Sequence, residues 1–147
     1  MGDDEPEAVV KYMVACARTT HPSDSSHEEY TLHEVRYYFD IPANREWPVQ
    51  LDRLWLFVRF YTEAEALSLT LALDWLDAPG GEVGVGYFDW QVAFNPADLV
   101  HDRVWNVSTM RYPGQGQYRF RLTDDATGDI LADEYIFIRS SNEARAE

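Results

Sequence analysis

The sequence has one cysteine, one lysine and no long apolar run. Because Cys16 is the only cysteine in 147 residues, an intrachain disulfide is impossible. No apolar stretch approaches the roughly 20 residues that a membrane-spanning helix needs. The N-terminus is acidic and lacks the basic start and apolar stretch of a signal peptide. These absences predict a soluble, cytoplasmic protein with no membrane partner.

Positive charge is also scarce. The chain carries 12 Lys and Arg residues against 26 Asp and Glu residues, which gives a formal net charge of −14. A field of this sign repels phosphate backbones and anionic lipid surfaces. We therefore expect neither nucleic acid nor membrane to be a partner. A protein partner or a second copy of the chain stays possible.

What the sequence does have is apolar and aromatic residues in alternating patterns. Hydrophobic residues make up 46% of the chain and aromatic residues 14%. Alternation of apolar and polar residues is typical of strands with one buried face. The runs that predict strands, about eight in number, are 9–17, 30–39, 53–61, 68–76, 82–94, 103–110, 117–123 and 130–138.

These runs, with turn signals between them, predict an all-β fold. We expect a two-sheet antiparallel sandwich, immunoglobulin-like or jelly-roll-like, with at most one or two short helical turns. The length fits a single domain, residues 9–139. Residues 1–8 and 140–147 are predicted to be disordered tails. The pattern does not predict the order of the strands.

Residues 62–76 carry two conflicting signals. Thr62 and Glu65 have the spacing of a helix capping box. From Ser68 onward, however, the large residues Leu69, Leu71 and Leu73 alternate strictly with smaller or polar ones, which a helix would scatter around its surface. The sequence therefore predicts a turn at 62–67 and a strand at 68–76.

Glycine and proline mark the other breaks. The segments 77–81 and 124–129 are predicted turns because proline, aspartate and glycine cluster in them. Gly84 and Gly86 interrupt the strand 82–94, which indicates a bulge or a close backbone contact. Residues 95–99 are expected to hold one helical turn.

The C-terminal hairpin carries a resemblance. Its motifs are Pro113-Gly114, Tyr118-x-Phe120-x-Leu122 and Gly128-x-x-Leu131-Ala132, and the N-terminal strand adds Val14-Ala15-Cys16-Ala17. In these residues the chain resembles small bacterial β-sandwich domains of unknown function. The resemblance implies a fold and transfers no catalytic or ligand-binding residue.

Three histidines could form a metal site. His21, His27 and His33 are evenly spaced, and imidazole is a ligand for zinc or nickel. A spacing of six residues does not suit one face of a helix, and nothing in the sequence enforces a compact loop. The favoured interpretation is a solvated loop, with His33 inside a strand. A metal-dependent enzyme that uses these histidines is the third functional hypothesis.

Asp124, Asp125 and Asp129 surround Gly128 and could bind calcium. The same residues are typical of an ordinary hairpin turn, in which aspartate caps and glycine takes a positive φ. The spacing is not that of an EF-hand, so the hairpin is the favoured interpretation.

Cys16 lies in an apolar strand rather than beside a base, which indicates a small buried residue and not a nucleophile. The sequence has no Gly-x-Ser-x-Gly elbow and no phosphate-binding loop. We therefore predict no catalytic residue and no cofactor, and we favour a protein that is not an enzyme.

The third strand, 53–61, is apolar on both faces. Leucine, valine and phenylalanine at its even-numbered positions suit the core, so Trp55, Phe57 and Tyr61 occupy the opposite face. A loop or the second sheet could cover this aromatic face. If it is uncovered, it predicts an interaction surface. The leading functional hypothesis is a protein-binding or self-assembling module, and the alternative is a carbohydrate-binding module that uses surface aromatic residues.

Overall fold

The computed structural model describes residues 8–20, 31–35, 38–51, 53–95 and 97–141. These segments contain nine strands and no helix. The strands are β1 Ala8–Thr20, β2 Thr31–Val35, β3 Tyr38–Pro42, β4 Trp55–Thr62, β5 Ala66–Trp75, β6 Val83–Ala93, β7 Val100–Asn106, β8 Gly116–Asp124 and β9 Ile130–Ser141. Strand structure therefore extends into both predicted tails, by one residue at Ala8 and by two at Ser140 and Ser141.

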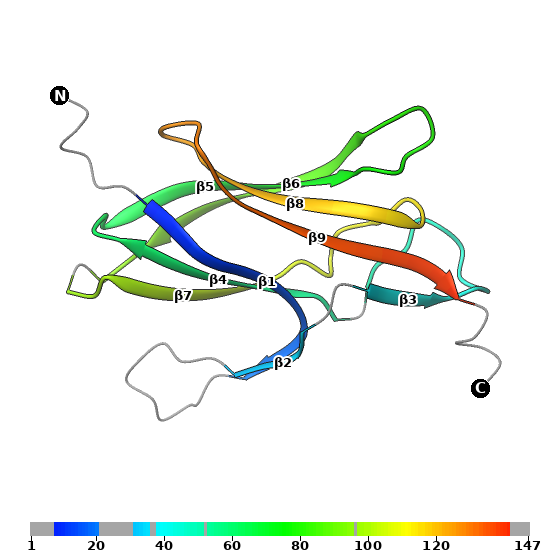
Figure 1. The fold of residues 1–147 in the computed structure, drawn as a ribbon, viewed down its shortest axis with the longest axis horizontal. Helices are drawn as coiled ribbons and strands as arrows, with labels where there is room; N and C mark the ends of the chain where they lie inside the picture. The colour runs from blue at the N-terminus through cyan, green and yellow to red at the C-terminus, as the bar shows by residue number, and fades with distance from the viewer. Residues whose placement is uncertain (1–7, 21–30, 36–37, 52, 96, 142–147) are drawn as a thin grey trace.

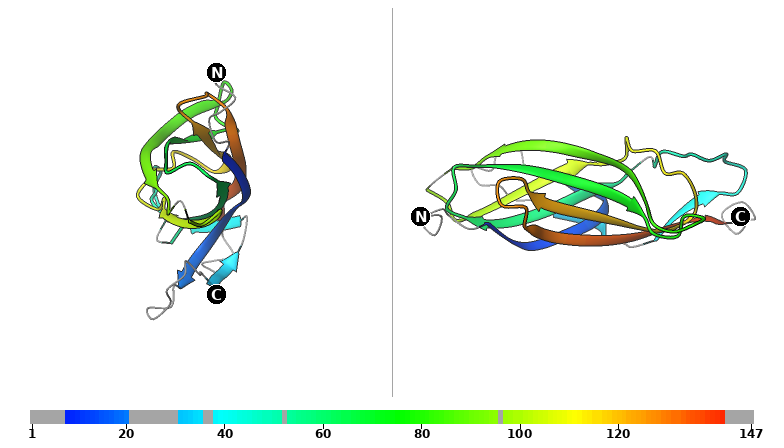
Figure 2. Two further views of the ribbon diagram at one scale, coloured as in Figure 1. Left: turned by 90° about the vertical axis from the view of Figure 1, so that its left-hand side faces the viewer. Right: turned by 90° about the horizontal axis from the view of Figure 1, so that it is seen from above.

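The strands form two sheets that pack face to face, which confirms the predicted sandwich (Figure 1). Sheet A has the order β2-β1-β4-β7, and sheet B has the order β3-β9-β8-β5-β6. All described strand pairs are antiparallel except β3 and β9, which run parallel. Viewed from its end, the sandwich curves around one core, and β2 with the last part of β1 extends away from it (Figure 2).

One predicted strand is wrong. The run 30–39 is not a single strand, because it forms β2 in sheet A and β3 in sheet B. β2 pairs with the end of β1, with Thr31 opposite Thr20, whereas β3 pairs with β9. The alternation of apolar residues along this run is irregular because its two halves belong to different sheets. His33 lies within β2, as predicted.

The strand interpretation of residues 62–76 is confirmed. The Thr62 hydroxyl accepts a hydrogen bond from the Ala64 N–H at 3.0 Å, so this threonine caps a turn rather than a helix. β5 then begins at Ala66, and Leu67, Leu69, Leu71 and Leu73 are buried. β5 pairs with β6 on one side and β8 on the other, which places its leucines at the centre of the core.

The predicted turns are also present. Gly80 and Gly81 have φ angles of 87° and 117°, and Gly128 has a φ of 77° in the β8–β9 hairpin. The β5–β6 register shifts where Leu73 faces Gly86 and Asp74 faces Gly84, which is the expected bulge. Residues 95–99 differ from the prediction: the Asp98 N–H donates to the Asn95 carbonyl at 3.0 Å in a turn, without a helix among the described residues.

The core lies between the inner faces of the sheets. Leu56, Val58 and Phe60 of β4, and Leu54 just before it, are fully buried in one cluster with the leucines of β5. Trp90 of β6 stacks on Trp105 of β7 at 4.0 Å between ring centroids, which closes one side of the sandwich. The described segments contain no helix that is long and apolar enough to cross a membrane.

At the other side of the sandwich, a carboxylate joins β9 to β1. The buried Glu134 accepts the Ala15 N–H at 3.1 Å through Oε2 and the Tyr135 N–H at 3.0 Å through Oε1. The two sheets are therefore linked at this edge by a backbone-to-carboxylate hydrogen bond. Burial raises the pKa of Glu134, and the two N–H donors partly oppose that rise.

Candidate interaction surface

The predicted aromatic face is the outer face of sheet A. Residues directly opposite one another on neighbouring strands share a face of the sheet. Along β4, Tyr61 lies between Val9 of β1 and Val100 of β7. In the same way, Arg59 lies between Tyr12 and Asp102, Phe57 between Val14 and Val104, and Trp55 between Cys16 and Asn106. Across β1, β4 and β7, this outer face therefore contains four rows of three residues.

Phe57 is covered, although it points outward. Its exposed fraction is 5%, and the Arg59 guanidinium lies 5.8 Å from the centre of its ring. Arg59 also lies 5.6 Å from the ring of Tyr12 and binds both carboxylate oxygens of Asp102, at 2.7 and 2.9 Å. The hydrogen bond with Asp102 is the main cause of a raised pKa for Arg59. A charged pair thus shields this part of the aromatic face from water.

Trp55 and Cys16 form the row at the far end of this face. Trp55 is half-buried, and Cys16 is fully buried with its Sγ 3.8 Å from the Trp55 carbonyl oxygen. The burial of Cys16 confirms the prediction from its apolar strand. Of the three residues predicted as an interaction face, only Tyr61 is exposed, at 40%.

The row that contains Tyr61 is apolar and open to solvent. The exposed fractions are 51% for Val9, 40% for Tyr61 and 48% for Val100. Leu99, at 58%, precedes Val100, and Tyr12, at 46%, lies one row further along. We call these five residues the end patch. A shallow pocket of about 420 Å³ lies within it, lined by Tyr61, Thr62, Glu63, Leu99 and Val100.

Acidic residues lie next to the end patch, and one of them, Glu63, lines its pocket. Glu63 and Glu65 are exposed in the turn between β4 and β5, and Asp98 is exposed just before Leu99. Among the described side chains of the outer face, the basic residue nearest to the patch is Arg59, which is already paired with Asp102. The patch is therefore apolar at its centre and negatively charged at its rim.

Sequence patterns indicated Tyr61 but not the other members of the patch. Val9 and Val100 are ordinary strand residues until the strand order places them on either side of Tyr61. A register shift between Val10 and Tyr12 also returns Tyr12 to the outer face. No local signal encodes these long-range pairings.

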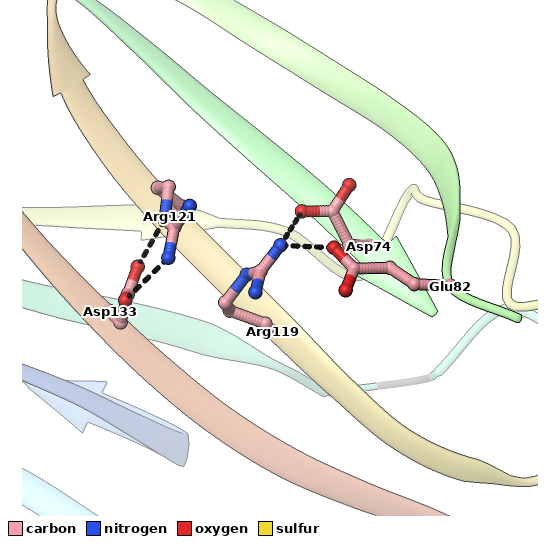
Figure 3. Close-up of polar contacts among 5 residues, drawn as sticks. All are labelled: Asp74, Glu82, Arg119, Arg121 and Asp133. Carbon is pink, nitrogen blue, oxygen red and sulfur yellow. Dashed lines mark hydrogen bonds and ion pairs between the residues drawn. The ribbon is translucent and has the colours of Figure 1, made fainter. Parts of the chain in front are cut away.

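The outer face of sheet B has a different composition (Figure 3). Arg119 on β8 donates to Asp74 of β5 at 2.8 Å and to Glu82 at 2.5 Å. Arg121, two residues further along β8, binds both oxygens of Asp133 on β9 at 2.8 and 3.0 Å. Arg119 is therefore bound by two carboxylates through one nitrogen, Nη2, while its buried Nε has no described partner, and Arg121 is bound by one carboxylate through two nitrogens.

A group of aromatic rings lies at the β3–β9 edge of sheet B. Tyr38 and Phe137 are in contact, with 5.8 Å between ring centroids, and Arg139 lies 5.4 Å from the centre of the Tyr38 ring. Tyr38, Tyr135 and Phe137 line a pocket of about 280 Å³ together with Gln117. This pocket combines rings with an amide that can hydrogen-bond.

The candidate metal ligands Asp124 and Asp125 of the β8–β9 hairpin form hydrogen bonds within the turn and to β5. The Asp124 carboxylate accepts the Ala126 N–H at 3.0 Å, and Asp125 accepts the Thr70 hydroxyl at 2.7 Å. Within the described part of the chain, no three His, Cys, Asp or Glu side chains are grouped so that they could hold a metal ion. His21 and His27 lie outside the described residues, and of His33 only the backbone is described.

No family model and no curated protein matches the sequence. Solved structures do resemble the fold. The alkylpurine DNA glycosylase AlkC of Pseudomonas fluorescens, bound to DNA with an abasic site analogue, matches with a TM-score of 0.50 and 11% identity, over 90% of this chain and 30% of that one. The chain thus spans about a third of the glycosylase.

Two further structures match at lower TM-scores. An immunoglobulin-like protein of Pseudomonas aeruginosa matches at 0.45, with 14% identity, over 90% of this chain and 97% of that one. A β-glucosidase of Listeria innocua in complex with laminaribiose matches at 0.47, with 6% identity, over 92% of this chain and 16% of that one. At these identities, the likeness concerns the fold alone.

Proposed function

We propose that this chain is a non-enzymatic protein-binding module, and that its end patch docks a basic, partly apolar segment of another protein. The observation that carries the proposal is the row Val9, Tyr61 and Val100, which presents exposed apolar side chains across three neighbouring strands. Exposed apolar groups that gather inside a polar rim are typical of interaction sites. Leu99 and Tyr12 enlarge the row on two sides.

Charge decides the kind of partner. The rim residues Glu63, Glu65 and Asp98 are acidic, and the whole chain carries a net charge of −14. A second copy of the chain would bring the same charge to the interface, and like charges oppose association. A segment that carries lysine or arginine beside its apolar residues complements both the centre and the rim of the patch.

The test uses two synthetic peptides, one that alternates valine with lysine and one that alternates valine with glutamate. We expect the lysine peptide to bind and to shift the backbone amide signals of β1, β4 and β7 in ¹⁵N-labelled protein. The double substitution Tyr61→Ser with Val100→Ser should weaken binding at least tenfold, about 1.4 kcal/mol. Added salt should also weaken it, because the rim is exposed.

Tyr87→Ser supplies the matched control, because Tyr87 is exposed on β6 of the other sheet. It should leave binding unchanged. Equal binding of the glutamate peptide, or equal loss in the control, would contradict the proposal. Sedimentation experiments test self-association. If the wild-type protein is a dimer and the patch substitutions convert it to a monomer, the partner is a second copy of the chain and not a basic segment.

A carbohydrate ligand is the second candidate, and the pocket at the β3–β9 edge favours it. Rings that can stack, together with the Gln117 amide, suit a sugar. Tyr38→Ala should then abolish amide shifts caused by soluble polysaccharides, whereas the end-patch substitutions should not. Unchanged spectra of the wild-type protein across a set of polysaccharides would exclude this candidate.

A further inference from the structure

A pocket beside edge strand β3 contains two arginines that have no acidic partner among the described residues. The pocket has a volume of about 410 Å³, which lies in the range of small-molecule sites. It is lined by Phe39, Asp40, Ile41, Pro42, Arg45, Gln50, Leu51 and Arg53. β3 itself lies at the edge of sheet B, beside the C-terminal part of β9 (Figure 1).

The pocket has an apolar floor and a basic rim. Phe39, Ile41 and Leu51 are buried beneath it. Arg45 and Arg53 are exposed and line the same space. Asp40 also lines it, but its carboxylate binds the Arg139 guanidinium at 2.6 Å. Since Arg139 balances the charge of Asp40, the two remaining arginines give the pocket a positive charge.

These two arginines differ from the ion-paired arginines of the sheets. Among the described residues, Arg59, Arg119, Arg121 and Arg139 each form an ion pair with a carboxylate. Neither Arg45 nor Arg53 pairs with a described carboxylate. A guanidinium presents several N–H donors in one plane, which match the oxygens of a carboxylate or phosphate.

The backbone on either side of the pocket is fixed. The Arg45 N–H donates to the Pro42 carbonyl at 3.0 Å, which closes the turn after β3. Gln50 donates through Nε2 to the Thr109 carbonyl at 3.0 Å. Leu54, which follows Arg53, is fully buried and accepts the Val107 N–H at 3.0 Å. Both arginines therefore extend from anchored segments, which lowers the entropic cost of holding a ligand between them.

We propose that this pocket binds a small organic anion, a carboxylate or a phosphate monoester with an apolar body. The arginines Arg45 and Arg53 hold the anionic group, and the apolar body packs toward Phe39, Ile41 and Leu51. The site is separate from the end patch, since the two share no lining residue. The anionic group can belong to a free small molecule or to the C-terminus of a peptide.

The test measures binding of phenyl phosphate, benzoate and a dipeptide with a C-terminal phenylalanine by ligand-observed NMR and calorimetry. Benzyl alcohol serves as the neutral counterpart, and inorganic phosphate as the anion without an apolar body. We expect at least one of the three organic anions to bind, and tighter than both comparison compounds. Arg45→Gln and Arg53→Gln should each weaken its binding at least tenfold. Binding of the dipeptide alone would identify a peptide terminus as the source of the anion.

Arg111→Gln is the matched control, because Arg111 is exposed, has no described carboxylate partner and lies outside the pocket. It changes the net charge by the same amount and should leave binding unchanged. If Arg111→Gln weakens anion binding as much as the pocket substitutions do, the weakening is due to net charge alone and the proposal is overturned. Absence of binding by all three organic anions at millimolar concentration would also overturn it, as would binding of benzyl alcohol or inorganic phosphate with equal affinity.

Discussion

On the outer face of sheet B, the arginines Arg119 and Arg121 are paired with carboxylates (Figure 3), whereas at one end of sheet A the row Val9, Tyr61 and Val100 is exposed and apolar. Both surfaces belong to the same sandwich and are built from alternate residues of similar strands. The charged groups of the first are paired within the sheet, which leaves them less to gain from a partner. The apolar groups of the second gain by leaving water.

The outer face of sheet A is itself divided by the ion pair between Arg59 and Asp102. On one side of that pair Phe57 is buried, and on the other side Tyr61 is exposed. The same strand therefore presents one ring that contributes to stability and one that is available for binding. Burial, rather than residue type, separates the two roles.

The largest effect should come from comparing these two rings. Phe57→Ala should lower the free energy of unfolding by about 3 kcal/mol, because it removes a buried ring and leaves a cavity under Arg59. Tyr61→Ala should lower it by less than about 1 kcal/mol, because its ring is exposed. Urea denaturation of both variants measures the difference. Equal losses would show that Tyr61 is structural and would remove it from the end patch.

A smaller effect should separate the ion pairs of the two sheets. The side chain of Asp102 is only 5% exposed, whereas that of Asp133 is 25% exposed. Asp102→Ala should cost about 2 kcal/mol, because Arg59 loses both of its carboxylate hydrogen bonds in a partly buried setting. Asp133→Ala should cost less than about 1 kcal/mol, as exposed ion pairs do.

Thermal or urea unfolding of these two aspartate variants gives the comparison, and a double-mutant cycle with Arg59→Met isolates the coupling to Asp102. A coupling energy near zero would mean that Arg59 covers Phe57 without help from Asp102. The shielding of the aromatic face would then depend on the guanidinium alone.

Much of the fold could be predicted because its determinants are local. Alternation identified β5 despite the capping-box spacing of Thr62 and Glu65, because four leucines on one face of a strand bury more apolar surface than a short helix could. Gly84 and Gly86 indicated the bulge that the β5–β6 register contains. These features depend on residues that lie close together in the sequence.

The candidate sites could not be predicted in the same way. Tyr61 becomes part of a patch only because β1 and β7 flank β4, and Arg45 and Arg53 share a pocket only because the segment after β3 folds back toward Tyr112. The division of the run 30–39 between two sheets has the same origin. Strand order is set by long-range packing, which the period of a single run does not encode.

The smallest effect concerns Glu134, a buried carboxylate that has no described basic partner, unlike those of the outer faces. Burial raises its pKa above the ordinary 4.5, so its protonated form favours the folded state, and this contribution is lost as the pH rises through the folded-state pKa. Glu134→Gln does not titrate and should therefore become more stable relative to the wild type between pH 4.5 and neutrality. Urea denaturation across that range measures the change, with Glu63→Gln as the control, because Glu63 is exposed. If Glu134→Gln instead becomes less stable relative to the wild type as the pH rises, the N–H groups of Ala15 and Tyr135 stabilise the carboxylate more than burial destabilises it. The ionised form of Glu134 would then favour the folded state, as it does for the ion-paired carboxylates of the outer faces.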